Sequence, residues 1–262
     1  MPVILITGAT DGLGRGLAAR AAADGATVLI HGRDPQRIEQ TLAQLPAGRA
    51  RGYRADLSSL GEVLRLAAEL LEREARLDVL VNNAGIGTDV PGGGERMESA
   101  DGHELRFAVN YLAGYLLTRE LLPLLERSAP ARVVNVASAG QMPIDFDDVM
   151  LEHGYSGVRA YCQSKLAQIL FTFDLAERLD GSGVTTTALH PATYMPTKIV
   201  SSPASSLEQG VEATMRLIAD PELAAVSGRY FDGRSEERAH PQAYDPEARA
   251  RLRELSERLT AP

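Results

Sequence analysis

The sequence predicts an α/β fold in which a doubly wound, mostly parallel sheet of seven strands carries helices on both faces. Short apolar runs rich in β-branched residues recur along the chain, and amphipathic segments separate them. Such runs are typical of strands buried on both faces, and the alternation favours parallel strands joined by right-handed crossovers. No linker or repeat interrupts the pattern, so residues 1–262 are predicted to form a single domain.

Six of the expected strands are visible as apolar runs, at 2–7, 26–31, 76–82, 131–137, 183–190 and 228–232. The predicted helices are 13–25, 34–45, 58–75, 99–128, 158–179, 205–219 and 246–259. Two of them carry clear end signals. Gly25 suits a helix C-terminus, and Asp34 before Pro35 predicts an N-cap followed by proline at the first helical position.

Composition excludes several classes of protein. A net charge of −8 argues against a nucleic-acid partner, which requires a basic surface. The single cysteine, Cys162, cannot form an internal disulfide, and no apolar run approaches the length of a membrane span. The five histidines are scattered, so no metal site is predicted. We expect a cytoplasmic protein without a membrane or nucleic-acid partner.

A glycine-rich turn follows the first predicted strand and opens the first helix. The segment reads ITGATDGLGRG (6–16). Gly8, Gly12 and Gly14 would let the backbone turn tightly and approach a pyrophosphate, whose charge is met by the helix N-terminus. This context predicts a dinucleotide-binding Rossmann fold.

The end of the second strand predicts which dinucleotide binds. A free ribose 2′-hydroxyl usually meets an acidic residue there, whereas a 2′-phosphate needs arginine. The sequence is LIHGRDP, with Gly32 at the acid position and Arg33 after it. Arg15 in the glycine turn would supply a second guanidinium. NADP(H) is therefore predicted, with NAD(H) the less favoured alternative.

Residues 161–165 read YCQSK, which places Tyr161 and Lys165 four positions apart on a predicted helix. They would share one helix face, where an ammonium favours ionisation of a phenol. Taken alone, this common spacing favours two exposed side chains on a helix over a catalytic pair.

Seven motifs in order make the sequence resemble the short-chain dehydrogenase/reductase family over about residues 2 to 232. They are Thr7-Gly8-x-x-x-Gly12-x-Gly14, Asp56-Leu57, Asn82-Asn83-Ala84-Gly85, Asn110, Ser138, Tyr161-x-x-x-Lys165, and His190-Pro191-Ala192-Thr193 with Thr197. Ala192 departs from the family pattern, which has glycine there.

The resemblance implies a hydride-transfer enzyme. Tyr161 would be the acid/base, Lys165 would lower its pKa and hold the nicotinamide ribose, Ser138 would bind the substrate oxygen, and Asn110 would hold a relay water. The expected cofactor contacts are Thr7, Gly8, Thr10, Asp11, Gly12, Leu13, Gly14, Arg15, Arg33, Asp56, Leu57, Asn83, Ala84, Gly85, Tyr161, Lys165, Pro191, Thr193 and Thr197. One alternative is a non-catalytic NADP(H)-binding redox regulator. The other is an epimerase or dehydratase acting on a nucleotide sugar, but enzymes of that branch have a longer chain with a C-terminal substrate domain.

An extra segment at 142–157 resembles the retinol-dehydrogenase-like, NADP-preferring branch of that family. It mixes apolar residues with three aspartates, which predicts an apolar wall with an acidic rim and an apolar carbonyl or alcohol substrate. The 191–208 loop is expected nearby. The glycine- and serine-rich stretches at 91–99 and 201–208 fit either lids or plain surface loops. A homodimer or homotetramer is expected from apolar residues beyond a single helix stripe, namely Leu112, Leu116, Leu117, Leu166, Ile169 and Leu170.

Overall fold

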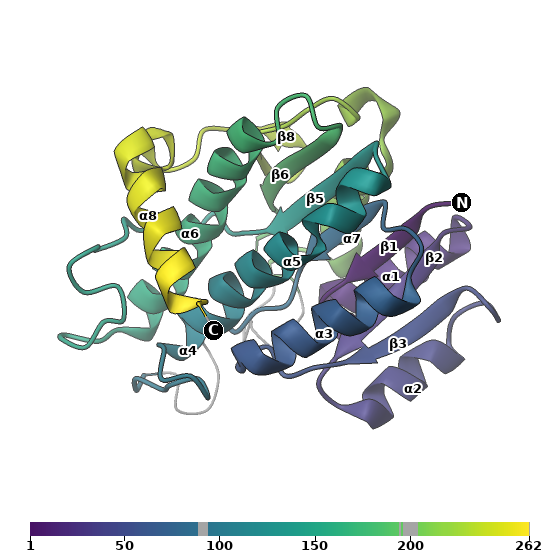
Figure 1. Ribbon diagram of the computed structural model, residues 1–262, viewed down its shortest axis with the longest axis horizontal. Coiled ribbons are helices and arrows are strands. Elements are labelled where there is room, and N and C mark those ends of the chain that lie inside the picture. Colours follow the sequence, from purple (N-terminus) through teal and green to yellow (C-terminus); the bar gives the residue numbers. More distant parts are fainter. Residues whose placement is uncertain (89–93, 194, 196–203, 262) are drawn as a thin grey trace.

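The computed structural model describes residues 1–88, 94–193, 195 and 204–261. Its centre is an eight-stranded sheet in the order β3-β2-β1-β4-β5-β6-β7-β8 (Figure 1). The first seven pair in parallel, and only β8 is antiparallel, to β7. The strands are β1 Val3–Ile6, β2 Thr27–Gly32, β3 Ala50–Arg54, β4 Val79–Asn82, β5 Ala131–Val136, β6 Val184–His190, β7 Arg229–Asp232 and β8 Ser235–Glu236. The predicted doubly wound α/β fold is confirmed.

The sheet has eight strands where seven were predicted, and two of them, β3 and the two-residue β8, are missing from the list of apolar runs. The sequence of β3 is ARGYR. It lies at one end of the sheet and pairs only with β2. Two of its five residues are exposed and only Tyr53 is buried. A strand at an open edge needs no continuous apolar run, so the pattern that identified the buried strands could not find it.

The helices lie on both faces of the sheet. Their bounds are α1 Gly12–Ala23, α2 Pro35–Ala43, α3 Leu60–Arg73, α4 Leu105–Phe107, α5 Ala113–Arg127, α6 Gly157–Arg178, α7 Leu207–Ala219 and α8 Pro246–Leu259. Short turns η1 Ala108–Leu112, η2 Pro221–Leu223 and η3 Pro241–Tyr244 join them. In Figure 1, α3, α5, α6 and α8 lie on the near face, with α1 and α7 behind.

The predicted helix 99–128 begins later than expected. Residues 99–104 are not helical, and Glu98 and Glu104 form an isolated antiparallel bridge. The Glu104 carboxylate then accepts a hydrogen bond from the Phe107 amide, which caps α4. A side-chain cap and a bridge thus replace the first turn and a half of helix.

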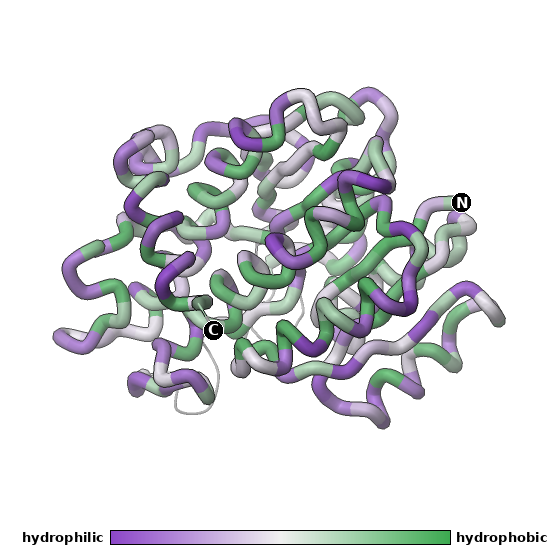
Figure 2. Tube along the Cα trace, in the orientation of Figure 1, coloured by the Kyte–Doolittle hydropathy of each residue, from purple (hydrophilic) through white to green (hydrophobic). Residues whose placement is uncertain are grey.

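Two hydrophobic cores fill the space on either side of the sheet. One joins α3, α5, α6 and α8 to the sheet, and the other joins α1 and α7 to it. In Figure 2, hydrophobic residues are frequent in the interior of the view and hydrophilic residues in the outer loops. Within the described ranges, no helix is long and apolar enough to cross a membrane.

The six apolar residues expected at a subunit contact are buried inside the chain. Leu112, Leu116, Leu117, Leu166, Ile169 and Leu170 each have 0% exposure. The C-terminal helix α8 packs on α6, where Leu252 is buried and Arg253 pairs with Asp174 (Figure 1). These side chains therefore complete the core of one chain, and they cannot form a subunit interface.

The predicted apolar wall at 142–157 is wrong for Ile144 and Leu151, which are buried in the hydrophobic core. Phe146 and Met150 are partly buried and pack against that core. The Gln242 side chain holds both backbone polar groups of Ile144, accepting from N–H at 2.7 Å and donating to C=O at 3.1 Å. Met142 stays 40% exposed. The extra segment is mainly a structural part of the fold.

Candidate active site

The glycine turn lies where β1 ends and α1 begins. Gly8 has φ +65° and Gly12 φ +47°, a region that favours glycine. A Cβ added to Gly14 would lie 2.3 Å from the Gly8 carbonyl oxygen, so the helix packs on the turn without space for a side chain. The turn thus leads directly into the N-terminus of α1, the kind of helix end that binds anions.

Asp11 does not point its carboxylate toward an anion. It caps α1 by accepting from the Gly12 amide at 2.9 Å, and it pairs with Arg37 at 3.0 Å. Asp11 therefore holds the start of α1, and its contact with a cofactor stays a prediction. Leu13 is buried in the core behind the turn.

Thr7 and Asn83 fasten the glycine turn to the end of β4. The Thr7 hydroxyl donates to the Val81 carbonyl at 3.2 Å and accepts from the amides of Asn83 and Ala84 at 2.9 and 3.0 Å. The Asn83 amide donates to the Thr7 carbonyl at 2.7 Å. These two predicted cofactor contacts brace the backbone that surrounds the site.

His31 performs a similar task that the sequence did not reveal. Its Nδ1 accepts from the Gly8 amide at 3.1 Å, so Nε2 carries the proton donated to the Ala55 carbonyl at 3.1 Å. Burial lowers the pKa of His31 to about 4, which keeps the ring neutral. A polar ring near the end of an apolar strand was the only signal in the sequence.

The ends of β2 and β3 form the site predicted for adenosine. A Cβ on Gly32 would lie 2.6 Å from the Thr10 methyl carbon, so Thr10 packs against the strand end. Arg33 and Arg15 are both exposed. Position 32 is a glycine and carries no acidic side chain. A 2′-phosphate site requires this absence, because a carboxylate there would repel the phosphate.

Asp56 and Leu57 follow β3, and Leu57 is buried in the core. Asp56 accepts hydrogen bonds from the Ser58 amide and hydroxyl at 2.9 and 2.8 Å. Burial alone would raise the pKa of Asp56, but these bonds and the charge of Arg33 outweigh it and lower the pKa. The Arg33 guanidinium therefore acts electrostatically on the carboxylate next to the predicted ribose position.

Ser138, Tyr161 and Lys165 converge beyond the end of β5. The Lys165 ammonium lies 5.8 Å from the centre of the Tyr161 ring and donates to the Val136 carbonyl at 2.8 Å. It also donates to Gln168 Oε1 at 3.0 Å. The Ser138 oxygen accepts from the Gly140 amide at 3.0 Å, which leaves its proton free to donate.

Burial changes the pKa of both Tyr161 and Lys165. Burial raises the pKa of the Tyr161 phenol, and a hydrogen bond with Ser138 opposes that rise. Burial lowers the pKa of Lys165 to about 7. The ammonium hydrogen-bonds to a backbone carbonyl and an amide and is itself only partly charged near neutrality. In the cofactor-free protein burial therefore favours the neutral form of both Tyr161 and Lys165.

Asn110 lies in η1, a single turn of π-helix, which is rare and frequent at functional sites. Its Oδ1 accepts from the Ile86 amide at 2.7 Å, and its Nδ2 donates to the Ile86 carbonyl at 3.1 Å and to Ser164 Oγ at 2.9 Å. A Cβ on Gly85 would lie 3.3 Å from Asn110 Oδ1 and 3.5 Å from Lys165 Nζ. Gly85 thus lies between the two polar groups.

The opposite side of the site is described only in part. Pro191 is buried after β6, and the exposed Thr193 lies 3.1 Å from His190 Nε2 through its hydroxyl. Thr197 lies outside the described residues, as do 89–93 and 196–203. The two possible lids and the 191–208 loop therefore stay predictions. Across the described ranges, no group of three or more His, Cys, Asp or Glu side chains could hold a metal ion.

The family model for short chain dehydrogenases matches residues 2–206. The chain belongs to the short-chain dehydrogenase family. It is accordingly an oxidoreductase that uses a nicotinamide cofactor and acts on CH–OH groups.

Known members of the short-chain dehydrogenase family align along most of the chain. Human retinol dehydrogenase 14 is 37% identical, covering 97% of this chain and 84% of the relative. Human retinol dehydrogenase 13 is also 37% identical, with 98% and 83% covered. Among solved structures, the Pseudomonas aeruginosa RhlG/NADP active-site complex has a TM-score of 0.71 and 29% identity, covering 88% of this chain and 94% of that chain. A 3-ketoacyl-(acyl-carrier-protein) reductase from Brucella melitensis, complexed with NADH, has a TM-score of 0.70 and 26% identity, with 89% and 98% covered.

Proposed function

We propose that this protein transfers hydride between NADP(H) and an apolar alcohol or carbonyl compound, with Tyr161 as the acid/base. The observation that carries the proposal is the convergence of Ser138, Tyr161 and Lys165 at the end of β5, with Asn110 and Gly85 beside them. A phenol that keeps its proton is suited to giving it to a carbonyl oxygen as hydride arrives.

Each residue of the site has its own role in the proposed reaction. The bound nicotinamide supplies or accepts the hydride. Tyr161 donates its proton to the substrate oxygen, and the Ser138 hydroxyl, held by the Gly140 amide, donates a hydrogen bond to the same oxygen. Lys165 holds the nicotinamide ribose. Asn110 Oδ1 keeps one acceptor site beside Gly85, where a water would link Lys165 to solvent and return the proton.

NADP(H) is preferred to NAD(H) in this proposal. Exposed Arg33 and Arg15 at the adenosine end, and the lack of an acid at Gly32, support it. The solved relatives include one bound to NADP and one bound to NADH, so the family alone does not decide the cofactor.

The substrate is proposed to be an apolar alcohol or aldehyde, because the aligned relatives are retinol dehydrogenases. The test measures NADPH oxidation with apolar aldehydes and NADP⁺ reduction with retinol, with NADH and NAD⁺ in parallel. Turnover that disappears in Tyr161→Phe supports the proposal. Tight NADPH binding without turnover of any of these compounds would identify a non-catalytic redox regulator instead.

A homodimer or homotetramer also stays a proposal, and it needs a surface other than the six buried residues of α5, α6 and η1. Multi-angle light scattering at micromolar concentration tests it directly.

A further inference from the structure

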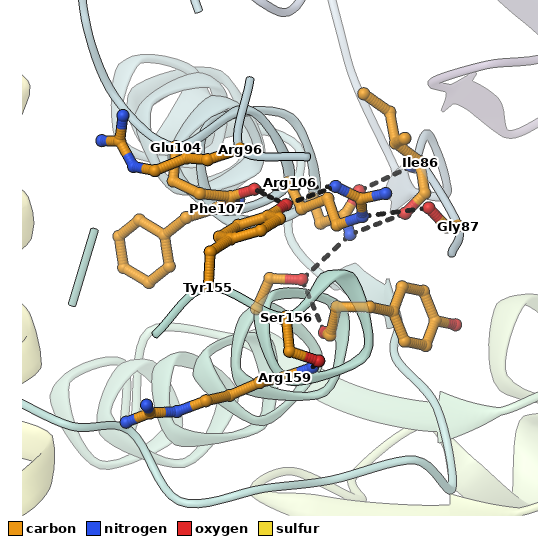
Figure 3. A network of polar contacts seen from close by, with 12 residues as sticks. Ile86, Gly87, Arg96, Glu104, Arg106, Phe107, Tyr155, Ser156 and Arg159 are labelled. Carbon is orange, nitrogen blue, oxygen red and sulfur yellow. Dashed lines mark hydrogen bonds and ion pairs between the residues drawn. The ribbon is translucent and has the colours of Figure 1, made fainter. Parts of the chain in front are cut away.

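Arg106 is a fully buried guanidinium that the proposed reaction does not use. Its exposure is 0%, and it is among the largest fully buried side chains of the described protein. Its Nε donates to the Gly87 carbonyl at 3.0 Å, and its Nη1 donates to the Tyr155 hydroxyl at 2.7 Å (Figure 3). A buried charge is expensive to desolvate, so a charge in this position needs partners.

Glu104 supplies the balancing charge. Its exposure is 1%, and its Oε1 lies 3.8 Å from Arg106 Nη1. The same oxygen accepts from the Tyr155 hydroxyl at 3.1 Å, while Oε2 accepts from the Phe107 amide at 2.7 Å. Figure 3 shows Tyr155 between Glu104 and Arg106, with Gly87 on the other side of the guanidinium. Buried ion pairs generally add little net stability, so stability is a weak reason for this network.

The geometry of this network indicates that Arg106 holds a backbone segment in position. Arg106 and Asn110 are one helical turn apart, and they hold consecutive residues of one backbone segment. Asn110 binds both polar groups of Ile86, and Arg106 binds the Gly87 carbonyl. This segment continues directly from Gly85, which lies between Asn110 and Lys165.

Tyr155 brings a third element into the network. It belongs to the extra segment 142–157, and the next residue, Ser156, caps α6 by accepting from the Arg159 amide at 3.4 Å. The helix α6 carries Tyr161 and Lys165. Arg106 therefore connects the backbone beside Lys165 to the point where the catalytic helix begins.

We propose that Arg106 is a positioning residue that fixes the Ile86–Gly87 backbone beside Lys165 for cofactor binding, and that Tyr155 holds the guanidinium in place. This inference rests on the proposed function, because it treats the 85–87 backbone as part of the NADP(H) site. It also requires that the extra segment contribute to cofactor affinity without touching the cofactor.

The test uses Tyr155→Phe, which keeps the ring and removes the hydroxyl, together with Arg106→Met and Arg106→Lys. Two quantities are measured on the purified cofactor-free protein: hydrogen exchange of the Ile86 amide by NMR, and the dissociation constant of NADPH by fluorescence. Loss of one charge-assisted hydrogen bond should speed Ile86 exchange and weaken NADPH binding by about tenfold or more. Arg106→Lys should recover part of what Arg106→Met loses.

Arg159→Met is the matched control. Its guanidinium pairs with Asp145 at 2.9 Å at the surface of the same region, outside the network. This variant should keep both quantities within about twofold of wild type, and the amides of β1 should be unchanged in all variants. Unchanged Ile86 exchange or unchanged NADPH affinity in Tyr155→Phe overturns the inference, as does an equal loss in Arg159→Met. Neither measurement needs turnover, so absence of carbonyl reduction would refute the proposed function and leave this test intact.

Discussion

The Lys165 ammonium lies 5.8 Å from the centre of the Tyr161 ring and donates to the Val136 carbonyl and Gln168 Oε1. The two residues share a helix face, as their spacing predicts, but the lysine is oriented toward the strand end. Burial acts on both groups in the direction of their neutral forms, raising the pKa of Tyr161 and lowering that of Lys165 to about 7. This relationship makes the pair testable through both activity and pH.

Tyr161→Phe should reduce turnover by at least about 100-fold while leaving NADPH affinity nearly unchanged, because in the proposed reaction the hydroxyl serves proton transfer and not cofactor binding. Ser138→Ala should lower kcat by about 100- to 1,000-fold through loss of a hydrogen bond to the substrate oxygen. Steady-state kinetics and NADPH titration of each variant measure the two effects separately. A Phe variant that keeps more than about a hundredth of the rate is incompatible with the acid role.

Lys165→Met should change how stability depends on pH. The folded pKa of about 7 lies below that of an unfolded lysine, about 10.4. Between these pH values the unfolded chain binds a proton that the folded chain does not, so this group makes wild-type stability rise with pH by up to about 1.4 kcal/mol per unit.

Urea unfolding of both proteins, cofactor-free, at pH 7, 8 and 9 tests this. The wild-type free energy of unfolding, minus that of the variant, should increase across the series, because other titrating groups cancel in the difference. A constant difference would show that Lys165 stays charged in the folded protein.

Arg33→Ala should weaken NADPH binding by about 10- to 150-fold and NADH binding far less, because only NADPH carries a 2′-phosphate for the guanidinium to bind. Arg15→Ala should act in the same direction. Arg20→Ala is the matched control, since Arg20 is an exposed arginine on α1 that pairs with Asp24. Titration of both cofactors into the three variants gives the comparison.

Equal losses for NADPH and NADH in Arg33→Ala would remove the main support for NADP preference. Installing an acid at Gly32 is a poorer test, because its Cβ would lie 2.6 Å from the Thr10 methyl carbon and distort the turn. The arginine variants add no atoms and avoid that problem.

Leu252→Ala should destabilise the protein by about 2–5 kcal/mol, because Leu252 is 1% exposed where α8 closes the core over α6. Glu254→Ala, an exposed position on the same helix, should cost less than about 0.5 kcal/mol. Urea denaturation measures both. A small loss in Leu252→Ala would mean that α8 is only loosely attached to the catalytic helix.

Local spacing was enough to predict the buried strands and the main candidate groups, but not the edge strands β3 and β8. The buried strands appear as apolar runs, the Gly8–Gly14 turn follows one of them, and four-residue spacing puts Tyr161 and Lys165 on one helix face. Parallel strands end at the same edge of the sheet, so residues that follow different strands meet there. Each of these features depends on periodicity or on a rule of chain topology, and both can be read from the sequence.

Only the tertiary structure decided which side chains are buried and how burial changes their pKa. The sequence marks Ile144, Leu151 and Leu166 as apolar, but it does not show whether substrate, a second subunit or the chain's own core covers them. The pKa directions of Tyr161 and Lys165 depend in the same way on atoms distant in sequence. Arg106 reads as an ordinary helix arginine until folding closes Gly87, Glu104 and Tyr155 around it. Burial and charge pairing depend on contacts between residues that are distant in sequence, so they are determined only when the whole chain is folded.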